Sequence, residues 1–295
     1  MPTYLTYFFG SFSAINIDGD PVSTSSQTIA STSTSLTPNS TTKMSTTATQ
    51  DNHYPPSLLS AWRSPRLLYR AIEDTPTDRL TLHTFIDADP VAIAMSSLRP
   101  LSPQPITFGQ RLYENAHLLH IRAFICLPPT EEEISQWEAA IAEKAEKSTL
   151  GVLDVEKLKM EFPKPGPKPI GVVTLCPPMG LEEQGHHRNA MIGVGIATEW
   201  RGKGYGGEAV DWVLDWGFGR LGLHRIWLAA FEFNERACRL YRKLGFVEEG
   251  RDRESVLFER RWWDLVRFGM LEGEWEQLRE KRKKSEDGEG GKMEE

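Results

Sequence analysis

Short apolar runs alternate with polar turns through most of this chain, and their lengths and spacing predict its secondary structure. Runs of strand length that end at polar residues or glycine predict strands at 65–73, 120–126, 170–175, 189–197, 225–231, 246–251 and 255–270. Helical spacing of apolar residues predicts helices at 108–118, 130–147, 208–218 and 234–244. Residues 77–86 fit a short helix or an irregular strand, and 262–264 fit a turn or a strand start. This alternation predicts an α/β or α+β domain with a single mixed sheet flanked by helices.

Both ends of the chain differ from this pattern. Residues 1–57 include a long Ser/Thr-rich run, which buries too little apolar surface to offset the entropy of ordering it. Residues 279–295 are almost all charged or glycine, so we expect a second disordered segment there. One domain is left over 58–278, and the Pro-rich stretch 163–169 marks the end of an insertion at about 128–169.

Composition narrows the function classes. The formal net charge is −7, which argues against a nucleic-acid binder. Three widely spaced cysteines, Cys126, Cys176 and Cys238, argue against disulfides and fit a reducing compartment. No histidine or cysteine pair has a partner at metal-ligand spacing, so we predict no metal site. No run of 18 apolar residues exists, so we expect no membrane span and a cytoplasmic location, with the nucleus as the alternative.

The most informative stretch runs from Arg201 to Gly207, between a predicted strand and a predicted helix. Its glycines let the backbone turn sharply and bring N–H groups close to a ligand. The following helix directs the positive end of its dipole at the same point. A basic Gly-rich turn before a helix is typical of an anion site, most often for phosphate. The alternative is a turn that merely links the strand to the helix.

A second signal lies at 234–246. Asn234 stands at a strand end and at the start of a helix, where asparagine is also a common cap. Tyr241 shares a helix face with Ala237, and it is either a core aromatic or a functional hydroxyl.

Together these segments resemble the GCN5-related N-acetyltransferase (GNAT) superfamily. The loop matches the Gln/Arg-x-x-Gly-x-Gly/Ala pattern through Arg201, Gly204 and Gly206. The order of strand, loop, helix, strand and helix over about 170–272 also matches. Residues 231–237, 249–251, Arg253 and Asp264 look like the branch that holds ribosomal-protein alanine acetyltransferases and spermidine acetyltransferases.

The resemblance implies acetyl-CoA as donor and an amine as acceptor. The loop Arg201, Gly202, Lys203, Gly204, Tyr205 and Gly206 would bind the pyrophosphate. A bulge would splay two parallel strands, and backbone groups near Ile196 and Ala197 would pair with the pantetheine arm and polarise the thioester carbonyl. Asn234 would contact the arm or order the helix start. Tyr241 would protonate the leaving thiolate.

The resemblance leaves the general base open. Met191 stands where many members of the branch have an acidic residue, and Ala237 stands where many have serine. Glu232 is the best substitute base and Glu199 the next, although each also fits an ordinary surface carboxylate. The alternative function is therefore an acyl-CoA-binding or regulatory module without catalysis.

Two nucleotide-binding readings are less favoured. A P-loop needs Gly-x-x-x-x-Gly-Lys-Ser/Thr, which the chain lacks. The loop glycines also have the wrong spacing for the dinucleotide pattern Gly-x-Gly-x-x-Gly. The acceptor remains open among a protein N-terminus, a polyamine and a small-molecule amine, and the sequence predicts no oligomeric state.

Overall fold

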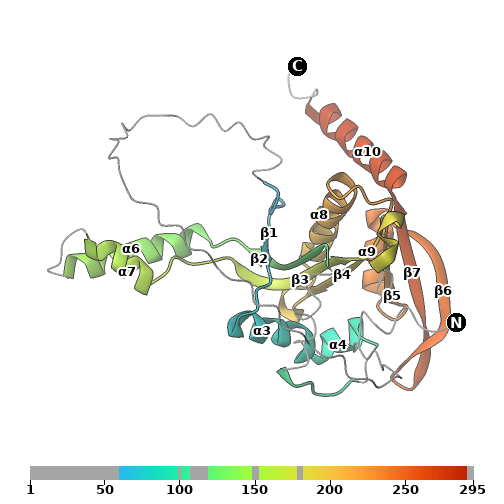
Figure 1. The fold of residues 1–295 in the computed structure, drawn as a ribbon, viewed down its shortest axis with the longest axis horizontal. Helices are drawn as coiled ribbons and strands as arrows, with labels where there is room; N and C mark the ends of the chain where they lie inside the picture. The colour runs from blue at the N-terminus through green and yellow to red at the C-terminus, as the bar shows by residue number, and fades with distance from the viewer. Residues whose placement is uncertain (1–59, 99–100, 107–118, 148–152, 178–181, 291–295) are drawn as a thin grey trace, which may run out of the picture. The chain divides into compact units, whose positions relative to one another are not determined.

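A computed structural model describes residues 60–98, 101–106, 119–147, 153–177 and 182–290. They form a seven-stranded sheet in the order β1-β2-β3-β4-β5-β7-β6 (Figure 1). The strands are β1 (Leu68–Ala71), β2 (Ile121–Leu127), β3 (Lys168–Cys176), β4 (Asn189–Ile196), β5 (Arg225–Phe231), β6 (Val247–Phe258) and β7 (Arg261–Leu271). Neighbouring strands are antiparallel except β4 and β5, which are parallel. The predicted single mixed sheet is confirmed.

The helices that the structure describes are α3 (Pro76–Leu82), α4 (Pro90–Ser96), α6 (Glu131–Lys147), α7 (Leu153–Glu161), α8 (Tyr205–Gly219), α9 (Glu235–Leu244) and α10 (Glu272–Gly290). A π-helical turn, η1 (His83–Asp87), joins α3 to α4, and short 3-10 turns occupy η4 (Glu182–His187) and η5 (Thr198–Trp200). The helix predicted at 108–118 and the segment 1–57 lie outside the described residues. Within that described part, no helix has the length and apolar character needed to cross a membrane.

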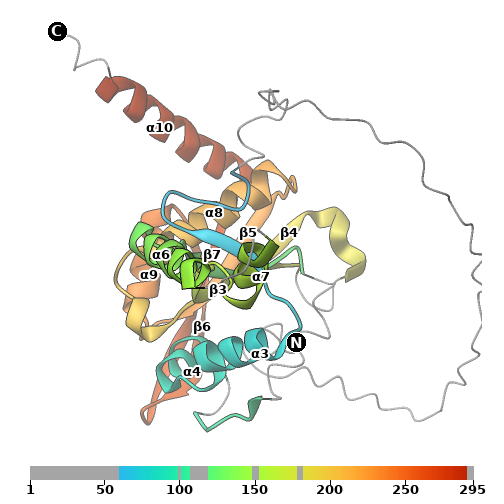
Figure 2. The ribbon, with the colours of Figure 1, turned by 90° about the vertical axis from the view of Figure 1, so that its left-hand side faces the viewer.

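The two faces of the sheet carry different helices. Ala123 and Ile125 of β2 belong to the main core with α8 and α9. Their neighbours Phe124 and Cys126 point to the opposite face, where they pack with Leu82 of α3. Figures 1 and 2 show α3 and α4 on one side of the sheet and α8 on the other. A site that opens through the sheet can therefore receive different ligands from its two faces.

Strands β4 and β5 diverge after a short paired stretch. Residues 189–191 pair with 225–227, whereas 192–196 of β4 have no partner on β5. The predicted splayed strand pair is therefore confirmed. The bulge expected with it is not found, because β4 pairs with β3 from Met191 to Ile196 without a register shift. The opening instead arises because β5 diverges from a continuous β3–β4 ladder.

The C-terminal elements differ from the sequence prediction in two places. The predicted strand 255–270 contains a hairpin turn, in which Glu259 and Arg260 adopt positive φ angles of 49° and 63°. Residues 262–264 accordingly lie at the start of β7. Helix α10 also continues past residue 278, where the sequence predicts a disordered tail. The guanidinium of Arg279 on α10 anchors this part of the helix, because its Nη1 donates to Asp211 Oδ1 of α8 at 3.1 Å.

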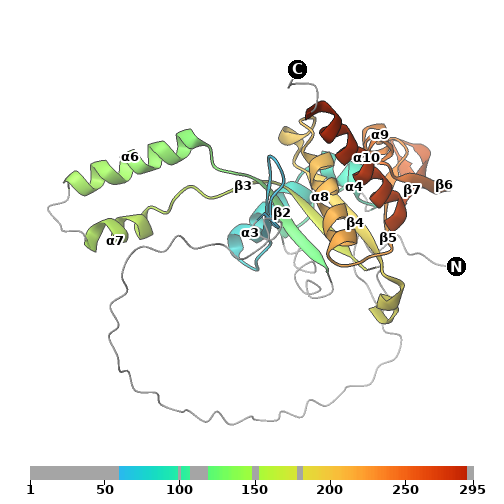
Figure 3. The same cartoon turned by 90° about the horizontal axis from the view of Figure 1, so that it is seen from above.

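The predicted insertion contains a helical hairpin. Helix α6 begins at the predicted capping box, in which the Glu133 N–H donates to Thr130 Oγ1 at 3.1 Å. The sequence did not predict α7, which lies beside α6 (Figures 1 and 3). The Trp137 indole N–H donates to the Phe162 carbonyl at 2.8 Å, and Lys144 lies 3.0 Å from the centre of the Phe162 ring. The two helices therefore stabilise each other.

Gly245 offers a test of how α9 and α10 meet. It ends α9 with φ of 95°, and a Cβ added there would lie 2.5 Å from Leu278 Cδ1. We predict that Gly245→Ala lowers the free energy of unfolding by about 1–3 kcal/mol, through left-handed strain and overpacking. Denaturant unfolding measures the change. The control is Gly273→Ala, whose added methyl would meet no described atom within 4 Å; it should leave stability unchanged or raise it by up to about 1 kcal/mol. Equal stability of the two variants would contradict this packing.

Candidate functional site

The Gly-rich loop forms a tight turn at the end of β4. Gly202 and Gly204 have φ angles of 88° and 86°, a region that other residues rarely adopt. Gly204 caps α8, which starts at Tyr205, three residues earlier than the sequence predicts. The N–H groups in the first turn of a helix have no acceptor within the helix. The loop therefore directs Tyr205, Gly206 and Gly207 N–H groups and a positive dipole end toward one place.

Arg66, which precedes β1, reaches this loop from far away in the sequence. Its Nε lies 2.8 Å from Glu208 Oε2, and its Nη1 donates to the Lys203 carbonyl at 3.0 Å. The guanidinium also lies 4.9 Å from the centre of the Tyr205 ring. Glu208 thus holds the Arg66 guanidinium beside the loop in a fixed orientation. A guanidinium fixed in this way is suited to bind an anionic ligand.

Two further guanidinium groups lie at the loop, Arg236 from α9 and Arg201 from the loop itself. A Cβ added to Gly202 would lie 2.8 Å from Arg236 Nη2, so this side chain of α9 lies over the turn. Burial lowers the pKa of Arg201, Asp89 opposes this effect, and the nearby Arg236 charge lowers it further. Like charges held this close repel one another, and a bound anion would relieve the repulsion. Together with Lys203, these residues make a cationic site at the start of α8.

Ile196 and Ala197 present their backbone groups to opposite sides. The Ala197 N–H donates to the Ile170 carbonyl of β3 at 2.9 Å, so it is already used within the sheet. Because backbone groups alternate along a strand, Ile196 faces β5, where pairing has ended. Its carbonyl accepts a hydrogen bond from Arg201 Nε at 2.8 Å. Of the two residues named in the sequence analysis, Ile196 has the orientation needed to meet a ligand between the strands.

Asn234 caps α9 and holds α4. Its Oδ1 accepts from the Ala237 N–H at 3.3 Å, and its Nδ2 donates to the Met95 carbonyl at 3.2 Å. Of the two roles implied for Asn234, ordering the helix start is the one its contacts support.

Leu240, further along α9, lies next to Gly206 and Gly207. The absence of side chains at these glycines lets α8 and α9 approach closely.

Tyr241 is buried on α9, in the main core. Its ring lies 6.0 Å from Phe246 and 5.8 Å from Phe268, centre to centre. Burial raises the pKa of the Tyr241 hydroxyl, and proximity to Cys238 raises it further. The group therefore carries its proton at neutral pH and has that proton to give.

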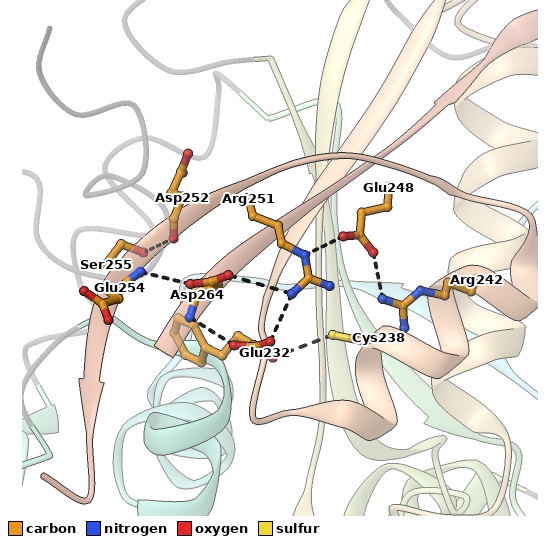
Figure 4. Close-up of polar contacts among 10 residues, drawn as sticks. Glu232, Cys238, Arg242, Glu248, Arg251, Asp252, Glu254, Ser255 and Asp264 are labelled. Atoms are coloured by element: carbon orange, nitrogen blue, oxygen red, sulfur yellow. Dashed lines mark hydrogen bonds and ion pairs between the residues drawn. The ribbon is translucent and has the colours of Figure 1, made fainter. Parts of the chain in front are cut away.

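Glu232 belongs to a charged network at the end of β5, drawn in Figure 4. Its Oε1 accepts from Arg251 Nη1 at 3.0 Å, and its Oε2 accepts from the Asp264 N–H at 3.4 Å. Arg251 also donates to Glu248 at 2.6 Å. Hydrogen bonding to Arg251 and Arg242 lowers the pKa of Glu248. Glu232 is thus part of a structural ion-pair network, and its carboxylate is already occupied.

The second candidate base is also engaged. Glu199 Oε1 accepts from the Trp200 indole N–H at 2.6 Å on an exposed part of the loop. Met191, the position at which the resemblance implies an acidic residue, is buried. Both candidate bases, Glu232 and Glu199, are therefore already hydrogen-bonded to other side chains.

The sequence analysis missed three residues that the fold brings to this site. Arg66 and Arg236 complete the cationic site. Asp89, the N-cap of α4, accepts from Thr198 Oγ1 at 2.5 Å and lies 3.9 Å from Arg201 Nη2. Arg236 follows Asn234 by two residues and had a signal in the motif. Arg66 and Asp89 had none, because both lie more than 100 residues before the loop.

Comparison with known proteins finds a similarity to one family over part of this chain. Residues 122–246 match the sequence model described as the acetyltransferase (GNAT) family. A spermidine N(1)-acetyltransferase of Vibrio cholerae is 36% identical over 89 residues, which are 30% of this chain and 51% of that protein. The putative ribosomal N-acetyltransferase YdaF of Bacillus subtilis is 34% identical over 90 residues, 30% of this chain and 49% of that protein. The chain spans about half the length of these curated relatives.

A solved structure agrees on the fold. The spermidine N-acetyltransferase of Vibrio cholerae in complex with CoA and spermine superposes with a TM-score of 0.51 and 22% sequence identity. The match covers 72% of this chain and 99% of that one. At this identity the likeness concerns the arrangement of helices and strands.

The cationic site makes a direct prediction for ligand binding. Arg236→Ala removes one guanidinium over the loop, and we expect it to weaken CoA binding roughly tenfold, the effect of a charge-assisted hydrogen bond. Isothermal titration calorimetry at two salt concentrations measures this loss, which should shrink as salt rises. Arg239→Ala is the control, because Arg239 is exposed on the same helix and pairs with Glu235 at 2.7 Å. Equal CoA affinity in both variants would exclude Arg236 from the site.

Proposed function

We propose that this chain, in which residues 122–246 form a GNAT-family domain, is an N-acetyltransferase that moves an acetyl group from acetyl-CoA to a primary amine. One observation carries the proposal: β4 and β5 stop pairing just before a basic Gly-rich loop that opens a helix. The diverging strands offer unpaired backbone groups for an amide-containing arm. The loop at the end of β4 offers N–H groups and arginines for a diphosphate.

The donor, acetyl-CoA, would lie along β4, in the opening that β5 leaves, with its diphosphate at the Gly-rich loop. Its pyrophosphate would bind the N–H groups from Tyr205 to Gly207 and the cations of Arg66 and Arg236. Its pantetheine arm, which has amide donors and acceptors like a strand, would pair with the side of β4 that β5 leaves. The Ile196 N–H is then oriented toward the thioester carbonyl, where a donor stabilises the negative charge that develops during attack.

Transfer would proceed by direct attack of a neutral amine on the thioester carbon. The carbon–nitrogen bond forms, the carbon–sulfur bond breaks, and the departing sulfur takes a proton. Tyr241 would supply it, since its buried hydroxyl carries a proton at neutral pH. The acceptor would approach from the face of α3 and α4, because α8 and α9 cover the other face.

The acceptor class follows from the relatives, which include spermidine and ribosomal acetyltransferases by name. We propose a polyamine or a protein N-terminus as the first acceptors to examine, and small-molecule amines next. The test incubates the protein with acetyl-CoA and each class, follows thiol release, and identifies products by mass spectrometry. Acetylated product with one class supports the proposal, and tight CoA binding without turnover of any amine would refute it.

A second candidate, a CoA-binding module without catalysis, has one observation in its favour. Met191 replaces the usual acidic residue, and Glu232 is bound by Arg251. In that case the binding half of the site would function alone, and the amine screen would detect ligand binding but no product.

Tyr241 separates these candidates. We predict that Tyr241→Phe lowers kcat by roughly 10²- to 10⁴-fold, the usual contribution of a positioned acid, and leaves CoA affinity unchanged. Steady-state kinetics and calorimetry measure the two quantities. Phe246→Leu is the control, because it changes the packing next to the Tyr241 ring, 6.0 Å away centre to centre, and leaves every hydroxyl in place. If both variants keep wild-type turnover, Tyr241 is only a core aromatic.

A further inference from the structure

The turn between α3 and α4 brings titratable groups to the end of β4. Its π-helical part, η1, packs against β4, and α4 packs against β5. Asp89 fixes this corner, because it binds Thr198 two residues after Ile196. At the other end of α4, the Met95 carbonyl binds Asn234. The segment therefore spans the opening between the diverging strands, on the face opposite α8 and α9.

Strand β4 presents little bulk to this corner. Ala190 and Ile192 belong to the core under α8, so the alternate residues Gly193 and Gly195 face α3 and α4. A Cβ placed on Gly195 would meet no described atom within 4 Å. No residue of β4 carries a charge. As far as the described residues go, the space beside Gly195, next to Ile196, is therefore open on the face that carries η1.

A histidine–aspartate pair stands on η1. His83 Nδ1 lies 3.9 Å from Asp87 Oδ2, and their side chains are 17% and 3% exposed. His83 Nδ1 is buried and has no hydrogen-bond partner in the described part of the chain. Single π-helical turns are rare and occur often at functional sites. Catalytic hydrogen bonds are often long before substrate binds, so a separation of 3.9 Å is compatible with a working pair.

We infer that His83, oriented by Asp87, is the general base that accepts a proton from the acceptor amine. This inference rests on the proposed N-acetyltransferase function and supplies the base that the motif lacks. Glu232 is held by Arg251, and Glu199 is exposed and bound to Trp200. The His83 pair is titratable, half-buried and placed on the acceptor face.

The proton balance is simple. A primary ammonium gives one proton to His83 Nε2, while Nδ1–H is directed at Asp87. The resulting amine lone pair forms the bond to the thioester carbon, and the carbon–sulfur electrons leave with sulfur. The thiolate takes a proton from Tyr241, and the second amine proton restores the tyrosine through solvent. His83 releases its own proton to solvent, so each turnover yields the amide, free thiol and one proton.

Charged groups lie on the elements around η1. Asp87 is on η1, and Asp89 is the N-cap of α4. Arg201 lies near Asp89, and Arg79, one turn earlier on α3, is bound to Asp74 at 2.5 Å. Asp78 on α3 is bound to Arg70 at 2.7 Å. The carboxylates of Asp87 and Asp89, two residues apart in the sequence, suit a cationic acceptor.

The test measures kcat/KM for the best acceptor across pH in the full chain. We expect His83→Gln to lose roughly 100-fold at pH 7, with the deficit shrinking as pH rises and the free amine becomes abundant. Asp87→Asn should also lower kcat/KM at pH 7, because His83 loses the carboxylate that orients it. Imidazole in the buffer should restore part of the activity of His83→Ala. CoA affinity should match wild type in every variant.

His224→Gln is the matched control, since His224 is exposed and lies 3.7 Å from Glu272, on an element that does not pack on η1. It should keep the wild-type profile. A His83→Gln deficit of equal size at every pH, or wild-type rates at every pH, would overturn the inference while leaving the acetyltransferase function intact. A wild-type protein that turns over no amine would overturn both.

Discussion

The site depends on the short pairing between β4 and β5. Two parallel strands held along their full length would satisfy each other's backbone groups and leave nothing for a ligand. Here pairing stops after Met191 and Trp227, while β3 keeps β4 straight on its other side. The strand remains rigid, yet its Ile196 backbone faces an opening. The loop and helix α8 follow at once, so an arm lying along β4 leads to a cationic turn. The divergence of β4 and β5 therefore determines where the donor binds and how it is oriented. It also lets the acceptor amine approach from the opposite face of the sheet.

Groups of opposite charge meet near the C-terminal end of β4. Arg66, Arg201 and Arg236 surround the loop, where a diphosphate would neutralise them. Asp87 and Asp89 lie on the acceptor face. Asp89 binds Thr198, which lies between this acidic group and the basic loop. Burial works to raise the pKa of Asp89, but the hydrogen bond from Thr198 and those from α4 lower it overall. A carboxylate ionised at neutral pH beside an arginine cluster separates an anionic donor from a cationic acceptor. This separation suits transfer between a CoA ester and an amine.

The sequence predicted the parts of the fold that are coded locally. Strand β5, helix α9 and the Gly245 cap followed from apolar spacing and from the need for glycine at positive φ. The loop and Asn234 followed from a motif with fixed spacing. The hairpin turn at Glu259 and Arg260 was missed, because neither residue is a usual turn former. Helix α10 was missed beyond 278, because its charges bind Asp211 across the fold. Arg66, His83 and Asp89 could not be found, since only tertiary packing brings them to β4.

A crystal structure of the chain with CoA tests the central claim most directly. The account predicts the pyrophosphate on the N–H groups that follow Gly204, with Arg236 in contact, and the pantetheine arm paired with β4 up to Ile196. It also predicts that the thiol lies within reach of the Tyr241 hydroxyl. A CoA molecule bound elsewhere, or β4 and β5 fully paired in the complex with the loop free, would contradict the account.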